Sequence, residues 1–288
     1  MIHHLTIIGV GLIGGSVAKA LRCENAVGHV TGFGRRESTL QRAQALGVID
    51  SWSLDLDAAV ERAEVVILAS PVNSIASIFH ELKPCLGEAT IVTDAGSVKG
   101  SIVDAAVRGL GDKIVNFVPG HPIAGKEKSG VDAASETLFH GHRTILTPMA
   151  NTGTEAISAV KDMWETIGAE VVFMEPSVHD ELLALTSHLP HALAFILVDL
   201  LSRQTNSKDC FNLSAGGFYD ITRVASGDPV MWRDIFLSNK QAILQRLTEY
   251  SSAIDDLAEL IDRSDSSALE EMFKHANSVR RQIKDRRS

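Results

Sequence analysis

Residues Thr6–Ser16 read TIIGVGLIGGS, a short apolar run that turns on glycines and continues into helix-forming residues. Gly9, Gly11 and Gly14 have the G-x-G-x-x-G spacing, in which the glycines permit a tight turn, a close approach to a pyrophosphate and close helix packing. The N–H groups that open the next helix would face the phosphates. The stretch therefore predicts a dinucleotide-binding turn rather than a glycine-rich turn without a ligand. The expected cofactor-binding residues here are Gly9, Gly11, Leu12, Ile13 and Gly14.

The second predicted strand, residues 29–33, bears on which cofactor is bound. An acidic residue that grips the ribose 2′-hydroxyl is expected about 20 positions after the glycine turn. This chain has Gly34 there, followed by Arg35 and Arg36. A carboxylate that would repel a 2′-phosphate is missing, and guanidinium groups that could pair with one are present. The pattern favours NADP, with NAD as the alternative if Arg35 stacks on the adenine instead.

Strands and helices alternate through the first 175 residues. Val65–Ala69 is a β-branched run typical of a buried parallel strand, and Ser70 and Pro71 end it at the sheet edge where ligands bind, so both are candidate cofactor contacts. Residues 1–175 are thus predicted to form a Rossmann-type α/β domain with a doubly wound, mostly parallel sheet. The other strands are expected at 89–94, 114–118, 144–147 and 170–173, and the helices at 40–46, 56–63, 75–82 and 155–167.

The pattern changes after Pro176, and no further strand is expected. Residues 176–288 are predicted to form an all-α domain for substrate binding and dimerisation, because so small an apolar helical half is poorly covered by itself. Pro190 should kink the first of its helices. The expected helical segments are 178–201, 212–226, 229–261 and 267–286.

Composition limits the classes of function. The 288 residues are 45% hydrophobic and carry a net charge of −9, which argues against a nucleic-acid partner. The three cysteines form no C-x-x-C pair, so we expect neither a metal site nor a disulfide frame, and a cytoplasmic location fits. The N-terminus lacks the basic region of a signal peptide. No uninterrupted apolar stretch is long enough to suggest a membrane span.

Four polar residues stand where predicted strands or helices end, and each has a structural alternative. Ser97 lies at an expected helix start, where it could simply be the N-cap. His121 follows a strand between Gly120 and Pro122, and it could be a satisfied structural histidine. His188 precedes the predicted kink, where packing is a strong alternative. Arg223 could be a surface charge or the fork that holds a substrate carboxylate.

These motifs together resemble the prephenate/arogenate dehydrogenase family over nearly the whole chain. The resemblance implies oxidative decarboxylation of a cyclohexadienyl acid, with hydride transfer to NAD(P) in tyrosine biosynthesis. The motifs that carry it are GVGLIGGS at 9–16, DAGSVK at 94–99, GHPIAGKEKSG at 120–130, SHLPH at 187–191 and GGFYDITRVA at 216–225.

The resemblance also implies roles for individual residues. His121 would contact the ring hydroxyl with help from Ser97, while His188 and Arg223 would line the substrate pocket and Glu127 would lie near the substrate side chain. Tyr219 departs from the arginine common in the family and leaves the charge around Asp220 open. Two other interpretations remain: a β-hydroxyacid-type dehydrogenase, which would need a catalytic lysine in the helical half, and a non-catalytic NAD(P)-sensing protein.

Overall fold

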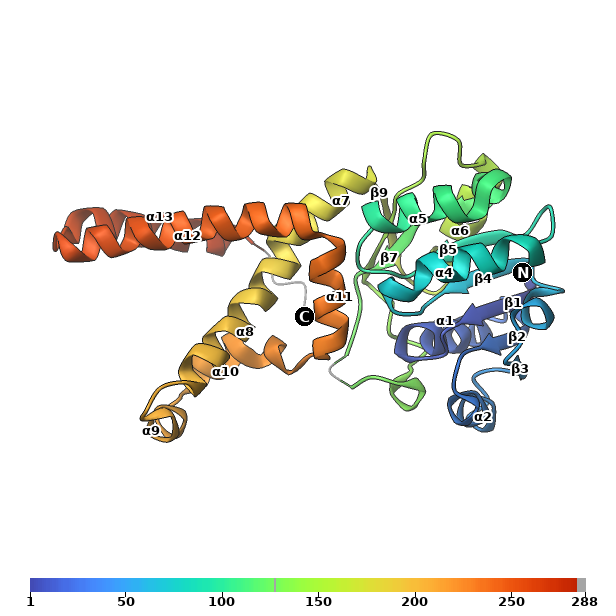
Figure 1. The fold of residues 1–288 in the computed structure, drawn as a ribbon, viewed down its shortest axis with the longest axis horizontal. Helices are drawn as coiled ribbons and strands as arrows, with labels where there is room; N and C mark the ends of the chain where they lie inside the picture. The colour runs from blue at the N-terminus through green and yellow to red at the C-terminus, as the bar shows by residue number, and fades with distance from the viewer. Residues whose placement is uncertain (127, 284–288) are drawn as a thin grey trace. The chain divides into compact units, whose positions relative to one another are not determined.

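The computed structural model describes residues 1–126 and 128–283 (Figure 1). The chain forms two compact units, residues 1–240 and 241–288. Glu127, an expected substrate contact, lies outside the described residues.

A six-stranded parallel sheet forms the centre of the first unit, in the order β3-β2-β1-β4-β5-β6 (Figure 1). The strand order reverses between β1 and β4, and this reversal creates the crevice in which open α/β sheets bind ligands. The strands are β1 Ile2–Ile8, β2 Val27–Phe33, β3 Ser51–Ser53, β4 Val65–Leu68, β5 Ile91–Asp94 and β6 Phe117–Val118.

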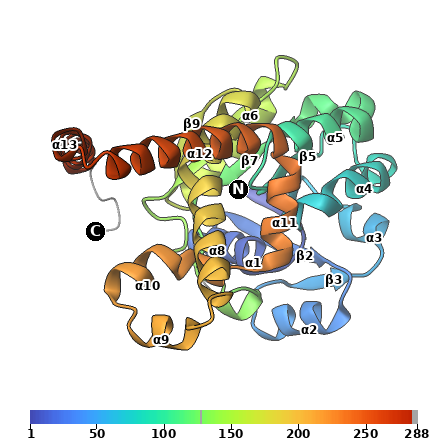
Figure 2. The same cartoon turned by 60° about the vertical axis from the view of Figure 1, so that its left-hand side comes forward.

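Helices cover both faces of this sheet, so the predicted doubly wound α/β fold is confirmed. Alternate side chains of β1 enter different cores: Ile7 packs with α1 (Leu12–Cys23), α2 (Glu37–Ala45) and α6 (Thr154–Thr166). Ile8 packs on the other face with α3 (Leu56–Val60), α4 (Val72–Leu82) and α5 (Gly100–Leu110). Figure 2 shows α4 and α5 side by side, as their shared apolar core requires.

The later strands form a separate, three-stranded sheet in the order β7-β8-β9, with β7 antiparallel to β8. The strand expected at 114–118 is mostly wrong, because a 3₁₀ helix occupies Gly111–Asn116 and leaves only the two residues of β6. A strand of two residues is too short to show the alternation of polar and apolar residues from which strands are predicted. The bounds are β7 Gly120–Pro122, β8 Arg143–Leu146 and β9 Glu170–Phe173.

The first helical stretch after β9 contains a π turn. Helix α7 (Pro176–Leu183) continues through the π turn Ala184–His188 into α8 (Leu189–Ser202). The N–H of Leu189 donates to the carbonyl of Ala184, five residues back. Because Pro190 has no N–H to donate, the expected proline-linked disturbance takes the form of this wider turn on its N-terminal side.

This combined helix, Pro176–Ser202, is long and apolar enough to cross a membrane by length and composition alone. It is not an uninterrupted apolar stretch, because Asp180, Glu181 and Asp199 lie along it. A core helix of a soluble protein can meet the same two criteria. Here the helix carries His179, Asp180 and His188, all buried among polar partners in the first unit.

The predicted single helix over 229–261 is wrong, because it breaks at Asn239 into α11 (Pro229–Ser238) and α12 (Lys240–Asp262). Asn239 is buried, and its amide is engaged by tertiary hydrogen bonds described below. The remaining helices are α9 Ser207–Asn212, α10 Gly216–Thr222, a 3₁₀ turn at Arg223–Ser226 and α13 Ser266–Gln282.

The second unit consists of the greater part of α12 together with α13. Asp265 caps α13, because its carboxylate accepts a hydrogen bond from the N–H of Ala268 at 3.0 Å. Both helices expose large apolar side chains, although an amphipathic helix normally buries its apolar face. The exposed side chains are Leu244, Tyr250, Ile254, Ile261, Met272, Phe273 and Val279.

Candidate active site and cofactor crevice

Two glycines of the turn after β1 are required by close contacts within the protein, independently of any ligand. Gly9 has φ of +98°, and a Cβ there would lie 2.7 Å from the carbonyl oxygen of Ala69. A Cβ on Gly14 would lie 2.6 Å from Cγ2 of Ile7 and 2.7 Å from the carbonyl oxygen of Gly9. These approaches hold the turn against both β1 and the segment after β4.

Gly11 is different, because a Cβ at this position would meet nothing within 4 Å. It is the N-cap of α1, and no side chain caps that helix end. The segment after β4 is held close to the end of β1, since the hydroxyl of Ser70 donates to the carbonyl of Ile8 at 3.1 Å. The space over Gly11 and the uncapped N–H groups after it therefore fit the pyrophosphate of a dinucleotide.

The segment after β2 presents two cations to solvent. Arg35 and Arg36 are exposed, and neither side chain makes a hydrogen bond or ion pair within the described part of the chain. A Cβ on Gly34 would lie 3.6 Å from Cδ2 of Leu40, an ordinary van der Waals contact. The fold thus tolerates a side chain at Gly34, where a carboxylate would grip a ribose hydroxyl.

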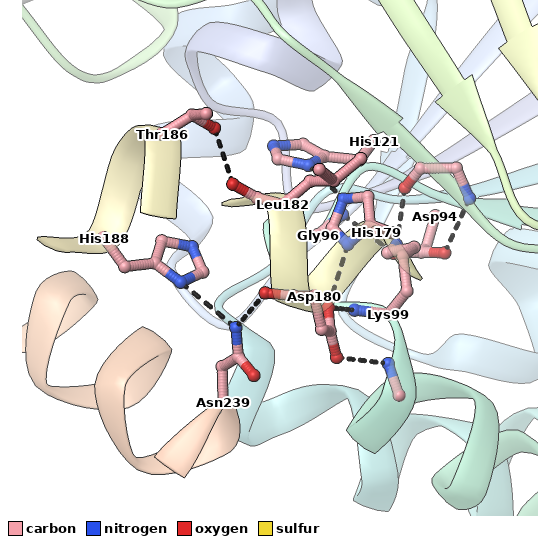
Figure 3. Close-up of polar contacts among 12 residues, drawn as sticks. Asp94, Gly96, Lys99, His121, His179, Asp180, Leu182, Thr186, His188 and Asn239 are labelled. Carbon is pink, nitrogen blue, oxygen red and sulfur yellow. Dashed lines mark hydrogen bonds and ion pairs between the residues drawn. The ribbon is translucent and has the colours of Figure 1, made fainter. Parts of the chain in front are cut away.

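His121 lies on β7 with 8% of its surface exposed and belongs to a chain of three polar side chains (Figure 3). Its Nδ1 is 2.8 Å from Nε2 of His179. Nδ1 of His179 is in turn 2.8 Å from Oδ1 of Asp180. Burial lowers the pKa of His121 well below its usual value, and the nearby charge of Lys99 lowers it further. His121 is therefore a neutral imidazole near pH 7.

The carboxylate of Asp180 is fixed by the start of α5. Oδ1 accepts from the N–H of Lys99 and Oδ2 from the N–H of Gly100, each at 2.8 Å. Burial alone would raise the pKa of Asp180, but the hydrogen bonds from His179 and from these two N–H groups outweigh it and lower the pKa. Asp180 is thus an ionised, acceptor-only group.

A buried ion pair holds the strand end that leads to His121. The side chains of Lys99 and Asp94 contact each other, and both are fully buried. Lys99 Nζ also donates to the carbonyl of Gly120 at 2.6 Å, while Asp94 accepts from the N–H groups of Gly96 at 2.8 Å and Gly120 at 3.1 Å. These bonds join the end of β5 to the start of β7 (Figure 3).

Ser97 lies within this Asp94–Lys99 loop but does not cap a helix. Helix α5 begins at Gly100 with Lys99 as its N-cap, so the predicted N-cap role of Ser97 is wrong. The physical reason is that the carboxylate of Asp180 already satisfies the first N–H groups of α5. The Ser97 hydroxyl is consequently not committed to helix capping.

His188 ends the π turn, is 1% exposed and contacts Asn239 from the end of α11 (Figure 3). The Asn239 amide donates to the carbonyl of Asp180 at 2.9 Å and reaches Nδ1 of His188 at 3.2 Å. Since an amide nitrogen can only donate, Nδ1 accepts and the proton of neutral His188 lies on Nε2. Burial lowers the pKa of His188 to about 4.

Arg223 begins the 3₁₀ turn after α10 and is exposed. Burial lowers the pKa of His191, its hydrogen bond to Ser187 opposes this shift, and the charge of Arg223 lowers the pKa further. His191 itself stacks on Trp232 with ring centroids 3.6 Å apart and donates through Nδ1 to the carbonyl of Ser187. The structure thus brings His121 and His188 together in one buried polar cluster. Arg223 lies beside α8, the helix that adjoins this cluster.

Sequence reasoning missed four residues of this cluster: Lys99, His179, Asp180 and Asn239. The available signal was the pair His179-Asp180 at the start of a mostly apolar helix, since buried ionisable residues need partners.

Family models match almost the entire chain. Residues 17–173 match the prephenate dehydrogenase nucleotide-binding domain, and residues 175–275 match the prephenate dehydrogenase dimerization domain. The cyclohexadienyl dehydrogenase of Zymomonas mobilis is 37% identical over 98% of this chain and 96% of its own length. The prephenate dehydrogenase of Bacillus subtilis is 37% identical over 96% of this chain and 75% of its own length.

Solved structures are similar over the same span. Prephenate dehydrogenase from Aquifex aeolicus, in complex with hydroxyphenyl propionate and NAD⁺, is 40% identical with a TM-score of 0.93 over 99% of both chains. Synechocystis arogenate dehydrogenase is 30% identical with a TM-score of 0.83, covering 97% of this chain and 99% of its own. With both halves matched in order, this chain belongs to the prephenate dehydrogenase family.

Proposed function

We propose that this protein oxidatively decarboxylates prephenate, and accepts arogenate too, with hydride transfer to a nicotinamide dinucleotide. The observation that carries the proposal is His121, a buried imidazole that is kept neutral and that, among the described residues, is hydrogen-bonded at one ring nitrogen only. A neutral imidazole is suited to accept the proton of the ring hydroxyl. Family membership supports the same reaction and weighs against the β-hydroxyacid and non-catalytic interpretations.

Each candidate site residue has a specific role in this reaction. His121 accepts the hydroxyl proton with help from Ser97, while His188 and Arg223 hold the anionic substrate and Glu127 lies near its side chain. The nicotinamide, when bound, takes the hydride from the carbinol carbon. Loss of carbon dioxide leaves an aromatic ring, which makes the reaction effectively irreversible.

The direct test is reduction of the nicotinamide cofactor by purified protein with prephenate or arogenate, followed by absorbance. Turnover of prephenate with the matching hydroxyphenyl keto acid as product supports the proposal. Turnover of arogenate alone would change the substrate assignment, and no turnover of either acid would refute it.

For the cofactor, we propose that the pyrophosphate is bound by Gly9, Gly11, Leu12, Ile13 and Gly14, with Ser70 and Pro71 on the adjoining segment. Gly11→Ala should then leave the melting temperature unchanged, because the added methyl meets no protein atom. It should weaken cofactor binding about 10- to 100-fold, the effect of about 1–3 kcal/mol of overpacking. Titration calorimetry measures the binding. Gly14→Ala is the matched control and should instead lower the melting temperature, since its methyl would strike Ile7.

We further propose NADP as the preferred form, held by Arg35 and Arg36. Gly34→Asp should reverse this preference, because a carboxylate there repels a 2′-phosphate and bonds a ribose hydroxyl. One charge-assisted pair is worth about 1.5–3 kcal/mol, so the ratio of kcat/KM for NADP to that for NAD should fall about 10- to 100-fold. A wild-type protein that prefers NAD would support adenine stacking by Arg35 instead.

We propose that residues 1–175 bind the dinucleotide and residues 176–288 form a homodimer in the cytoplasm, without nucleic-acid or membrane partners. The exposed apolar side chains of α12 and α13, and the match to a dimerization domain, support the homodimer. Obligate interfaces bury upwards of ~2,000 Å². Sedimentation should therefore show a dimer at micromolar concentration, and a stable monomer would contradict this prediction.

A further inference from the structure

The chain of contacts from Asp180 through His179 to His121 determines where the proton of each imidazole lies. Ionised Asp180 can only accept, so Nδ1 of His179 carries a proton. Burial lowers the pKa of His179 despite its bond to Asp180, so its other nitrogen, Nε2, is unprotonated. Nε2 therefore accepts from Nδ1 of His121 at 2.8 Å. This leaves the lone pair of neutral His121 on Nε2.

We propose that His179 and Asp180 are positioning residues that hold His121 in the tautomer with an unprotonated Nε2. The inference rests on the proposed function, in which His121 accepts the substrate's hydroxyl proton. That proton moves from the hydroxyl oxygen to Nε2, and the resulting imidazolium keeps its Nδ1–H bond to His179. The negative charge of Asp180 stabilises this cation through His179, as a carboxylate stabilises the imidazolium of a Ser-His-Asp triad.

The arrangement around Asp180 is too specific for a chance buried contact. Its two oxygens also receive the first N–H groups of α5, so the carboxylate cannot turn away from His179 without leaving backbone donors unpaired. The imidazole of His179 is completely buried, and both of its nitrogens are used to join His121 to Asp180. His188 has the opposite arrangement, with Nδ1 accepting from Asn239 and Nε2 protonated. The two predicted site histidines are thus fixed in complementary forms, one as a proton acceptor and one as a donor.

The tautomer can be measured on the full-length protein by ¹⁵N NMR of labelled histidine, with the His121 signals identified by their loss in His121→Asn. We expect the wild type to carry the His121 proton on Nδ1. In His179→Leu, which removes the acceptor, the proton should move to Nε2. Wild-type His121 protonated on Nε2 would overturn the proposal, whether or not the protein turns over prephenate. Absence of prephenate turnover with the expected tautomer would refute only the proposed function.

Kinetics provide the second readout. His179→Leu should lower kcat about 10- to 100-fold with little change in KM, which is at or below the smallest loss that removal of a general base typically causes. His179→Gln should recover part of this loss, because its amide oxygen can accept the same bond. In a His121→Asn background, His179→Leu should cost nothing more. Independent losses that multiply in the double variant would overturn the proposal. If circular dichroism shows that His179→Leu does not fold, the wild-type tautomer and the kinetics of His179→Gln still test the proposal.

Discussion

His121→Asn is expected to lose about 10²–10⁴-fold in kcat while it still binds cofactor and substrate. Asparagine keeps a polar side chain of similar reach but cannot take up a proton, so only the general-base contribution is removed. Because binding contacts remain, KM should change little and kcat/KM should fall with kcat. Steady-state kinetics with prephenate, together with calorimetric binding of the cofactor, measure both effects.

His80→Asn is the matched control, because His80 is exposed near the end of α4 and its side chain makes no hydrogen bond or ion pair with the residues that the structure describes. It should match the wild type in both kcat and KM. If His121→Asn keeps kcat within a few-fold of the wild type, His121 is a structural residue and the proposed reaction path is wrong. Arg223→Ala should differ from both variants by raising KM chiefly, since an anchor acts in ground and transition states alike.

Lys99→Met should produce a large loss of stability. Lys99 and Asp94 are both fully buried, and methionine would fill a similar volume without the charge. Removing one partner of a buried pair leaves an uncompensated charge and costs about 3–5 kcal/mol. Burial lowers the pKa of Lys99 and Asp94 opposes this shift, so the pair depends on their mutual contact. Urea unfolding at neutral pH measures the free energy of unfolding directly.

A surface ion pair offers the contrast to Lys99→Met. Lys161 pairs with Glu165 one turn along α6 at 2.6 Å, but both side chains are substantially exposed. Exposed pairs contribute little to stability, so Lys161→Met should leave the urea midpoint nearly unchanged. Equal losses in the two variants would show that burial of Lys99 does not set the cost.

The first half of the fold was predictable because its signals are local. The glycine spacing of residues 9–14 and the β-branched run at 65–69 identified the sheet and its ligand edge, and the structure confirms the doubly wound architecture. The break at Asn239 could not be predicted, because the helical periodicity continues through it. Tertiary hydrogen bonds to residues more than fifty positions away fix that break.

The candidate site was predictable only in part for a similar reason. His121 and His188 were identified by their motifs, and both prove to be buried. His179 and Asp180 follow no spacing rule, since the partners of Asp180 at Lys99 and Gly100 lie 81 and 80 residues away in sequence. Ser97 was placed correctly after the end of β5, but a capping hydroxyl was expected where a distant carboxylate binds the helix N–H groups.

The π turn at Ala184–His188 limits how this helical segment can vary among related proteins. Each residue added to an α-helix rotates every later residue by about 100° around the helix axis. The wider turn therefore sets the phase between His179 on α7 and His188 at its end. A regular α-helix over the same residues would instead rotate His188 relative to His179 and take one histidine out of the buried cluster. Relatives that keep both histidines and the same number of residues between them should therefore keep the wider turn as well.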